Sequence, residues 1–319
     1  MFRRMLIAGT IVGLCLGLLQ GIAAPATRAA QGTPAATPCA FDTKDAITAI
    51  VTNFNDAYNA HDAQAMAALA SRDLVRHSPR GDTQGADEMA DAFDAFFAIF
   101  PDTVTTTNLI LVDGSLAVAH VTSTGTQATS FKEIEPTGET ATWDGILMFH
   151  ITCGKIDELW SRADQLAQLN QATPALATPV AAPDDATPAQ CAELTHQSAQ
   201  ALMDTWYSDV WSGNFEALAT ITTQGVYHHW AVGPDSSGQD DQLAHLQQTV
   251  DAMTGLSTDY DAIVVDGDYI AVHWTQTLGD DNWDGLNIFR TECGLIDEVW
   301  SELDLAALPV QAQPATPAA

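Results

Sequence analysis

The sequence contains very few basic side chains. Among 319 residues there are 11 Lys and Arg against 41 Asp and Glu, which gives a formal net charge of −30 at pH 7. Proteins that bind nucleic acid or dock on anionic lipid need clustered positive charge. The composition therefore argues against nucleic acid and an anionic membrane surface as partners, although it says nothing about the fold.

Long apolar runs are scarce as well, and the one that exists lies at the N-terminus. Arg3 and Arg4 precede the apolar stretch 5–19, which is followed by small residues (GIAAPATRAA). This order is typical of a secretory signal peptide, because a run of about 15 residues is shorter than the roughly 20 that span a bilayer. We expect residues 1–30 to be removed on export, 31–38 to form a spacer, and the mature chain to be extracellular. Retention of the N-terminal segment would instead leave the protein at the cell surface.

What the sequence does contain is one segment twice. Residues 143–164 read WDGILMFHITCGKIDELWSRAD and residues 283–304 read WDGLNIFRTECGLIDEVWSELD, with 12 of the 22 positions identical. Stretches rich in Ala, Thr and Pro, typical of linkers, separate the copies and end the chain. The expected organisation is a first domain at 39–170, a linker at 171–189, a second domain at 190–308 and a tail at 309–319.

Four cysteines lie outside the N-terminal segment, and in an oxidising compartment they allow three pairings. Cys39 and Cys191 each precede a helical segment, whereas Cys153 and Cys293 each lie at a Cys-Gly turn within the repeated stretch. The repeat therefore predicts one disulfide per domain, Cys39–Cys153 and Cys191–Cys293.

Each repeat has helical signals first and strand signals after them. In the first repeat, residues 46–69 place apolar side chains at helical spacing with a break near 59–62, and a second helix is expected at 86–100. The expected strands, bounded by turns, are 103–112, 116–124, 143–152 and 156–163. In the second repeat, a first helix is expected over 198–218. This order predicts an α+β fold in each domain, with helices packed on an antiparallel sheet.

This series of elements resembles the NTF2-like cone, and the first repeat resembles the SnoaL-like group of polyketide or ester cyclase-type domains. The motifs that carry the resemblance are LVRHSP with His77, FPD at 100–102, GT at 125–126, PTG at 136–138 and the closing CGKIDELWSRAD. The second repeat keeps the order of elements and the closing hairpin but lacks FPD, GT and PTG, and it is 13 residues shorter before Trp283. The resemblance implies two tandem NTF2-like cones.

In the cyclases of this group, an Asp on the last strand acts as a general acid/base without a metal or other cofactor, beside a His on the preceding strand. By position these residues are Asp164 and His150. A Gln of the family falls on Met148 here, which puts a polyketide substrate in doubt. His77 is a candidate ligand contact at the cavity mouth or a structural histidine, and His228 or His229 is its counterpart. The chain has no HExxH, CxxC or Gly-rich phosphate motif, so no metal site is expected.

The register of the closing hairpin decides which side chains share a face. A glycine bulge at the Cys-Gly turn would place Thr152 opposite Ile156, and a tight two-residue turn would place it opposite Lys155 and separate His150 from Asp164. We favour the bulge, because it lines a pocket with aromatic and thioether groups. The residues expected to share that pocket are Asp144, Met148, His150, Trp160 and Asp164. Burial there would raise the pKa of Asp164 and suit proton transfer with a carbonyl compound; the alternative is that Asp164 caps the strand end in solvent.

Two functions follow from these observations. The first is a secreted protein whose first domain is a cofactor-free acid/base enzyme of the cyclase, isomerase or dehydratase type, acting on a small apolar carbonyl compound. In that case the second domain has a binding or structural role. The alternative is a non-catalytic extracellular protein that binds small molecules or partners with both cones. Because NTF2-like cones often pair through the outer face of the sheet, we expect the two repeats to pair within the chain as a pseudo-dimer.

Overall fold

The computed structural model describes residues 43–131, 134–170 and 191–308. The predicted signal peptide, spacer, linker and tail, together with Cys39, lie outside these residues. In the part that is described, no helix is both long enough and apolar enough to cross a bilayer.

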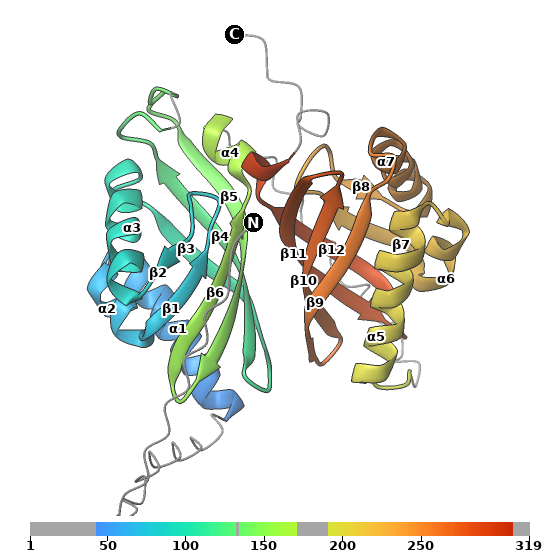
Figure 1. The fold of residues 1–319 in the computed structure, drawn as a ribbon, viewed down its shortest axis with the longest axis horizontal. Helices are drawn as coiled ribbons and strands as arrows, with labels where there is room; N and C mark the ends of the chain where they lie inside the picture. Colours follow the sequence, from blue (N-terminus) through green and yellow to red (C-terminus); the bar gives the residue numbers. More distant parts are fainter. Residues whose placement is uncertain (1–42, 132–133, 171–190, 309–319) are drawn as a thin grey trace, which may run out of the picture. The chain divides into compact units, whose positions relative to one another are not determined.

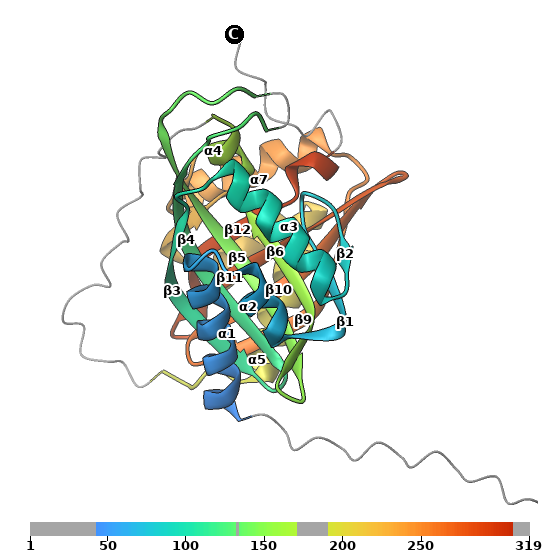
Figure 2. The same ribbon diagram turned by 90° about the vertical axis from the view of Figure 1, so that its left-hand side faces the viewer.

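The first domain begins with a helix that breaks where the sequence predicts. α1 (Lys44–Asn59) is followed by α2 (Ala63–Leu69), and between them His61 has a positive φ of 53°. Asp62 restarts the helix by accepting a hydrogen bond from the amide of Ala65 at 2.8 Å. α3 (Ala86–Ile99) is the second predicted helix. All three lie over one face of the first sheet (Figure 2).

That sheet has six strands in the order β2-β1-β6-β5-β4-β3, and only β1 and β6 pair in parallel. The four predicted strands are confirmed, but β1 was not expected, because Arg72, Asp73 and Arg76 interrupt its apolar pattern. The bounds are β1 (Ala70–His77), β2 (Thr83–Gln84), β3 (Val104–Asp113), β4 (Leu116–Thr126), β5 (Thr140–Thr152) and β6 (Lys155–Ala163). A short helix, α4 (Gln165–Asn170), follows β6.

The second domain repeats this topology with the order β8-β7-β12-β11-β10-β9 (Figure 1). Its strands are β7 (Thr222–His229), β8 (Ser236–Ser237), β9 (Ser257–Asp266), β10 (Tyr269–Leu278), β11 (Asp281–Glu292) and β12 (Leu295–Leu303). Its helices are α5 (His196–Asp204), α6 (Leu218–Ile221) and α7 (Gln239–Ala252), with short turns η1 (Thr205–Asp209), η2 (Val210–Ser212), η3 (Phe215–Ala217) and η4 (Leu305–Ala307). The single helix expected over 198–218 was therefore wrong, since a π-helical turn, η1, ends α5 early.

The second domain is shorter than the first in the connection between its two middle strands. In the first domain, residues 127–139 join β4 to β5, and the side-chain amide of Gln127 fastens this loop by donating to the carbonyls of Thr129 and Ile134, both at 2.8 Å. In the second domain, Gly279 and Asp280 alone join β10 to β11.

The closing hairpin combines features of both predicted registers. Cys153 and Gly154 have φ angles of 56° and 72°, as in a two-residue turn, and Thr152 pairs with Lys155. A bulge at Asp157 then shifts the register, so that His150 pairs with Glu158 and Met148 with Trp160. The predicted bulge at the turn was wrong, but the pairing expected beyond it is correct.

The two faces of each sheet bury different clusters. The face toward the helices packs side chains such as Phe149 and Leu159 against α1 and α3 in the first domain. The outer face of the first sheet carries a separate set of buried apolar side chains, among them Ile146 and Met148.

Of the two predicted disulfides, Cys191–Cys293 is confirmed, with Cα atoms 4.8 Å apart and 102 residues between them in sequence. Cys153 is also disulfide-bonded. Its predicted partner, Cys39, lies outside the described residues.

Candidate functional site

The predicted site residues of the first domain lie on the outer face of the sheet. Met148 is fully buried there in a cluster with Ile146, and Trp160 packs against the same cluster. Asp144 shares this face and accepts a hydrogen bond from the Thr122 hydroxyl at 2.6 Å. The expectation that these residues line the cavity must be corrected: a period of two fixes which residues share a face but not which face is the inner one.

His150 and Asp164 do not meet. His150 lies near the turn of the hairpin, where its Nδ1 is 2.6 Å from Asp157. Asp164 lies at the other end, where its amide donates to the carbonyl of Asp144 at 2.9 Å. Residues 144 and 150 of β5 are six apart, which is roughly 20 Å along an extended strand. The two side chains therefore cannot act on one substrate atom in this structure.

Asp164 caps a helix. Its Oδ1 accepts a hydrogen bond from the amide of Ala167 at 2.9 Å, in the first turn of α4. Burial raises the pKa of this carboxyl, and Asp144 and Asp235 add to the effect, while the amides of Ala167 and Leu166 oppose it. The predicted rise in pKa is present, but it arises at a helix cap. A catalytic role for Asp164 or His150 stays a prediction.

His77 belongs to an arrangement that occurs in both domains. Its ring stacks on Trp160, its Nε2 lies 3.1 Å from Glu158 and its Nδ1 lies 3.3 Å from Asp82. His229 stacks in the same way on Trp300, with Glu298 at 3.1 Å and Asp235 at 3.3 Å. His229 is therefore the counterpart of His77, and both rings lie on the outer face with the tryptophans.

The cavity of the first domain is almost filled. It measures about 70 Å³, and its lining includes Phe54, Tyr58, Phe93, Phe96 and Trp143. Phe131, from the loop that the second domain lacks, also lines it. In the described part of the chain, neither Asp164 nor His150 belongs to this lining.

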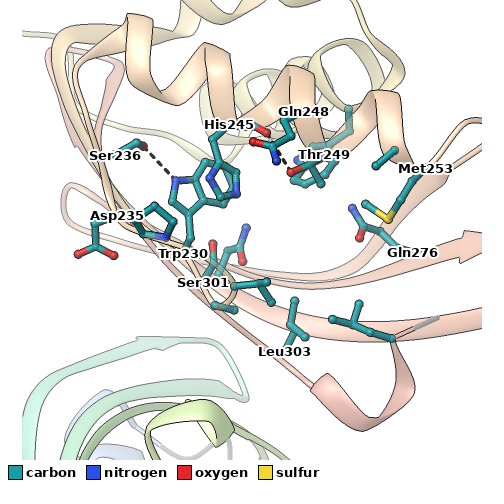
Figure 3. Close-up of a pocket in the computed structure, with 18 of the residues that line it drawn as sticks. Trp230, Asp235, Ser236, His245, Gln248, Thr249, Met253, Gln276, Ser301 and Leu303 are labelled. Carbon is teal, nitrogen blue, oxygen red and sulfur yellow. Dashed lines mark hydrogen bonds between the residues drawn. The ribbon is translucent and has the colours of Figure 1, made fainter. Parts of the chain in front are cut away.

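The second domain holds a much larger cavity, of about 600 Å³. Figure 3 shows its two sides: Gln248 and Thr249 come from α7, Met253 directly follows that helix, and Gln276, Ser301 and Leu303 come from the sheet. At one end, the rings of Trp230 and His245 stack with centroids 4.0 Å apart (Figure 3). A cavity of this size is typical of small-molecule sites.

Two carboxamide side chains lie on the sheet side of this cavity. Asn287 stands where the first domain has Leu147, and its Oδ1 accepts from Nε1 of Trp274 at 2.8 Å. Gln276 accepts from Nε1 of Trp283 at 3.0 Å. These bonds fix both carboxamides and leave the Nδ2 group of Asn287 to donate to a molecule in the cavity.

Two further donors lie on the lining. Nε1 of Trp211 makes no hydrogen bond to any residue that the structure describes, and the hydroxyl of Tyr207 lies beside the amide of Asn287, which lowers its pKa against the larger effect of burial. Tyr207 is only 3% exposed. A buried donor without a partner costs about 1–3 kcal/mol, so a ligand oxygen that accepts from it gains binding free energy.

A serine and a histidine meet at the wall of this cavity. Ser301 lines it, and its Oγ lies 2.7 Å from Nε2 of His228, which is fully buried. On the other side of the ring, Nδ1 lies 3.3 Å from Nε2 of the buried Gln242. Burial lowers the pKa of His228 well below its usual value, with His245 and His229 adding to the effect, so the ring is neutral near pH 7.

This second-domain site is not predicted from the sequence, because the motifs shared with the SnoaL-like group lie in the first domain. A position-by-position comparison of the two repeats would have indicated the site, because Asn287 occupies the position of Leu147 and His228 that of Arg76. Sequence alone does not show that Phe54, Phe93 and Phe96 fill the first cavity.

No group of three or more His, Cys, Asp or Glu side chains is arranged to hold a metal ion within the residues that the structure describes.

Comparison with known proteins supports the tandem organisation. The family model for SnoaL-like polyketide cyclase matches residues 48–172, and the model for the SnoaL-like domain matches residues 203–299. No curated protein matches the chain.

Solved structures align with one domain's length of the chain. TsrD from Streptomyces laurentii is 22% identical over 40% of this chain and 96% of its own, with a TM-score of 0.38. AclR from Streptomyces galilaeus is 20% identical over 41% and 99%, with a TM-score of 0.37. A SnoaL-like polyketide cyclase from Agrobacterium tumefaciens is 18% identical over 39% and 96%, with a TM-score of 0.36. These values carry no argument about activity. From the two family models and the two six-stranded sheets with their helices, the chain consists of two SnoaL-like domains of the NTF2-like fold in tandem, the second more divergent.

Proposed function

We propose that this protein binds a small organic molecule in the cavity of its second domain. The observation that carries the proposal is the contrast between two cavities in equivalent folds, about 600 Å³ in the second domain and about 70 Å³ in the first. Aromatic walls from Trp230, Trp274 and Trp283 favour a flat apolar body. Nε1 of Trp211, which has no partner among the described residues, and the buried hydroxyl of Tyr207 favour an oxygen acceptor on that body.

Tryptophan fluorescence offers a direct test. Four of the eight tryptophans line the cavity, namely Trp211, Trp230, Trp274 and Trp283, so bound aromatic probes should quench emission. We expect 1-acetonaphthone to bind more tightly than 1-ethylnaphthalene, which has nearly the same shape but no acceptor. One hydrogen bond of about 1 kcal/mol corresponds to a roughly fivefold difference in Kd.

Matched variants locate the site. Leu303→Trp fills the second cavity and should abolish quenching by both probes, whereas Ala163→Leu, at the equivalent position of the first domain, should leave their Kd values unchanged. Binding that survives Leu303→Trp but is lost in Ala163→Leu would place the ligand in the first domain and overturn the proposal.

An acid/base enzyme in the first domain has less support. His150 and Asp164 lie at opposite ends of one hairpin, and the first cavity is too small for a carbonyl compound of more than a few atoms. The direct check is Asp164→Asn, which should leave any activity of the protein unchanged if the second domain holds the site.

We also propose that the two domains pair through their outer sheet faces. The proposal is supported by the shared apolar cluster, by the ion pair between Arg162 and Asp284, and by two reciprocal bonds, in which the amide of Val112 donates to Asp266 at 2.9 Å and that of Val265 to Asp113 at 3.0 Å. Met148→Asp should separate the domains and increase the radius of gyration in solution scattering.

Export from the cell remains part of the proposal, because the N-terminal segment has the order of a signal peptide and a disulfide is present. N-terminal sequencing of the protein from culture medium tests it: a start after Ala26 or Ala29 supports export and cleavage, and full-length protein confined to the cells contradicts it.

A further inference from the structure

The second-domain cavity contains the parts of a nucleophilic site. On the assumption that this cavity binds a small molecule, as proposed above, we propose that Ser301 is a nucleophile, activated by His228, that cleaves a small ester bound there. Such a site needs a hydroxyl within hydrogen-bond reach of a base, a third group that orients the base, and donors for the oxyanion that forms.

The first two requirements are met by three residues on three elements. Ser301 of β12 lines the cavity, and its Oγ lies 2.7 Å from Nε2 of the buried His228 of β7. Gln242 of α7 lies on the other side of the imidazole, with its Nε2 3.3 Å from Nδ1, while its Oε1 has no hydrogen-bond partner among the described residues. A half-turn of this amide exchanges the two atoms and presents Oε1 to Nδ1, which then carries the proton and donates to Oε1. Nε2 of His228 then has its lone pair toward Ser301, which is the tautomer a general base requires.

The third requirement is met by the neighbouring strand. Asn287 is the direct partner of Ser301 across β11 and β12, on the same face, where side chains of paired residues stand about 5 Å apart. Its Oδ1 is held by Trp274, which leaves its Nδ2 group to donate to Tyr207 or to a molecule in the cavity. The buried hydroxyl of Tyr207 lies beside the same amide and has a proton to donate. Together they can donate to the carbonyl oxygen of an ester that Ser301 attacks.

The chemistry is a two-step acyl transfer to water. Oγ of Ser301 bonds to the acyl carbon while its proton passes to Nε2 of His228. The bond from the acyl carbon to the alcohol oxygen breaks, and that oxygen leaves with the proton from His228. A water molecule then adds to the acyl carbon and gives its proton to His228, after which Ser301 leaves with the proton and the free acid departs.

The first domain shows which of these parts are specific to the site. Ser161 occupies the position of Ser301, but Arg76 stands in place of His228 and Leu147 in place of Asn287. The first domain therefore has the serine without a base or an oxyanion donor. Ser161 is a matched control.

The test uses the full-length chain and two probes. A fluorophosphonate should label the unmodified protein once, on the peptide that contains Ser301, and 1-naphthyl acetate should be hydrolysed. Ser301→Ala should lower kcat at least 100-fold and abolish labelling, while Ser161→Ala should change neither. Gln242 acts as a positioning residue, so Gln242→Leu should lower kcat about tenfold and leave KM unchanged.

A pH profile separates this base from an ordinary histidine. Since burial keeps His228 neutral well below pH 6.5, kcat/KM should stay level between pH 7 and pH 5.5, where an unperturbed histidine base would lose most of its activity.

The outcomes distinguish the two proposals. If 1-acetonaphthone quenches the tryptophans but the fluorophosphonate leaves Ser301 unlabelled, the cavity binds ligands and the nucleophile is refuted. If neither probe engages the second domain, the proposed function fails with it. Hydrolysis that persists in Ser301→Ala also refutes the nucleophile, and labelling of the unmodified chain decides the question even if that variant does not fold.

Discussion

The imidazole of His228 occupies in the second domain the position that the guanidinium of Arg76 occupies in the first: Arg76 pairs with Leu159 in one sheet and His228 pairs with Val299 in the other. Both side chains are buried, but they face different surroundings. The histidine meets a serine and an amide beside an open cavity, whereas the arginine lies over the ring of Phe93, 4.8 Å from its centre. This position is therefore one of those at which the two domains differ in the chemistry of their cores.

Arg76 should weaken the first domain. It is 2% exposed, its Nε makes no hydrogen bond within the described residues, and burial, with repulsion from Arg80 and Arg162, lowers its pKa to about 9. Because the folded state disfavours its charge, we expect Arg76→Met to raise the free energy of unfolding by about 1–4 kcal/mol at pH 7. Urea unfolding measures the change, and a loss of stability would show that attraction to Asp82 outweighs the burial of the charge.

His229 should make the second domain sensitive to alkaline pH. Burial lowers its pKa, but hydrogen bonds and attraction from Asp235 and Glu298 outweigh this and raise the pKa to about 9. Because the pKa of His229 is higher in the folded state than in the unfolded state, protonation stabilises the fold. This contribution is fully present below the unfolded pKa of about 6.5 and is lost as pH rises through about 9. We expect thermal unfolding to show a loss on the order of 2 kcal/mol between pH 6.5 and 9.5.

The two domains offer a control for this effect. His229→Gln should flatten the pH dependence. His77→Gln should alter it far less, because Glu158 is 38% exposed whereas Glu298 is 3% exposed and is screened less by water. Equal effects of His77→Gln and His229→Gln would show that burial of the paired glutamate does not cause the pH dependence of stability.

Asp164 should behave as a cap. Asp164→Ala removes the acceptor for the amide of Ala167 and should cost about 1 kcal/mol of unfolding free energy. Asp164→Asn keeps an acceptor and removes a carboxylate whose pKa burial raises, so its stability at pH 7 should equal or exceed that of the unmodified protein. A loss in both variants would indicate that the charge itself is needed.

The disulfide of the second domain should contribute strongly to its stability. Cys191 and Cys293 are separated by 102 residues, and closing a loop of that length is worth up to about 4 kcal/mol in the chain-entropy model. Cys191→Ser with Cys293→Ser should lower the unfolding free energy by a comparable amount. A non-reducing peptide map should recover Cys191 joined to Cys293 and Cys39 joined to Cys153; a Cys39–Cys191 peptide would refute one bridge per domain.

Much of the fold could be predicted from sequence because the signals are local. The break at His61, the helix that ends before Pro101 and the strands around Gly turns all depend on neighbouring residues. β1 escaped prediction because its pairing with β6 joins residues far apart in sequence, as His77 with Trp160, and its own pattern is interrupted by charges.

The candidate site was harder to predict for a different reason. Met148 and Trp160 form an apolar stripe that resembles a pocket lining, but they lie on the face of the sheet that the helices do not cover. Apolar periodicity shows that a face is buried without showing what covers it. Only the three-dimensional arrangement reveals that Phe rings fill the cavity of the first domain, whereas the cavity of the second domain is open.

The short connection between β10 and β11 bears on kinetics. In the first domain, a residue of the long β4–β5 loop, Phe131, reaches the cavity wall, whereas in the second domain two turn residues take the place of that loop and neither belongs to the lining. A ligand that enters the second-domain cavity therefore does not have to displace a loop between β10 and β11. Association should therefore run at a rate set by diffusion and by the width of the entrance, and residence time should depend on wall contacts alone.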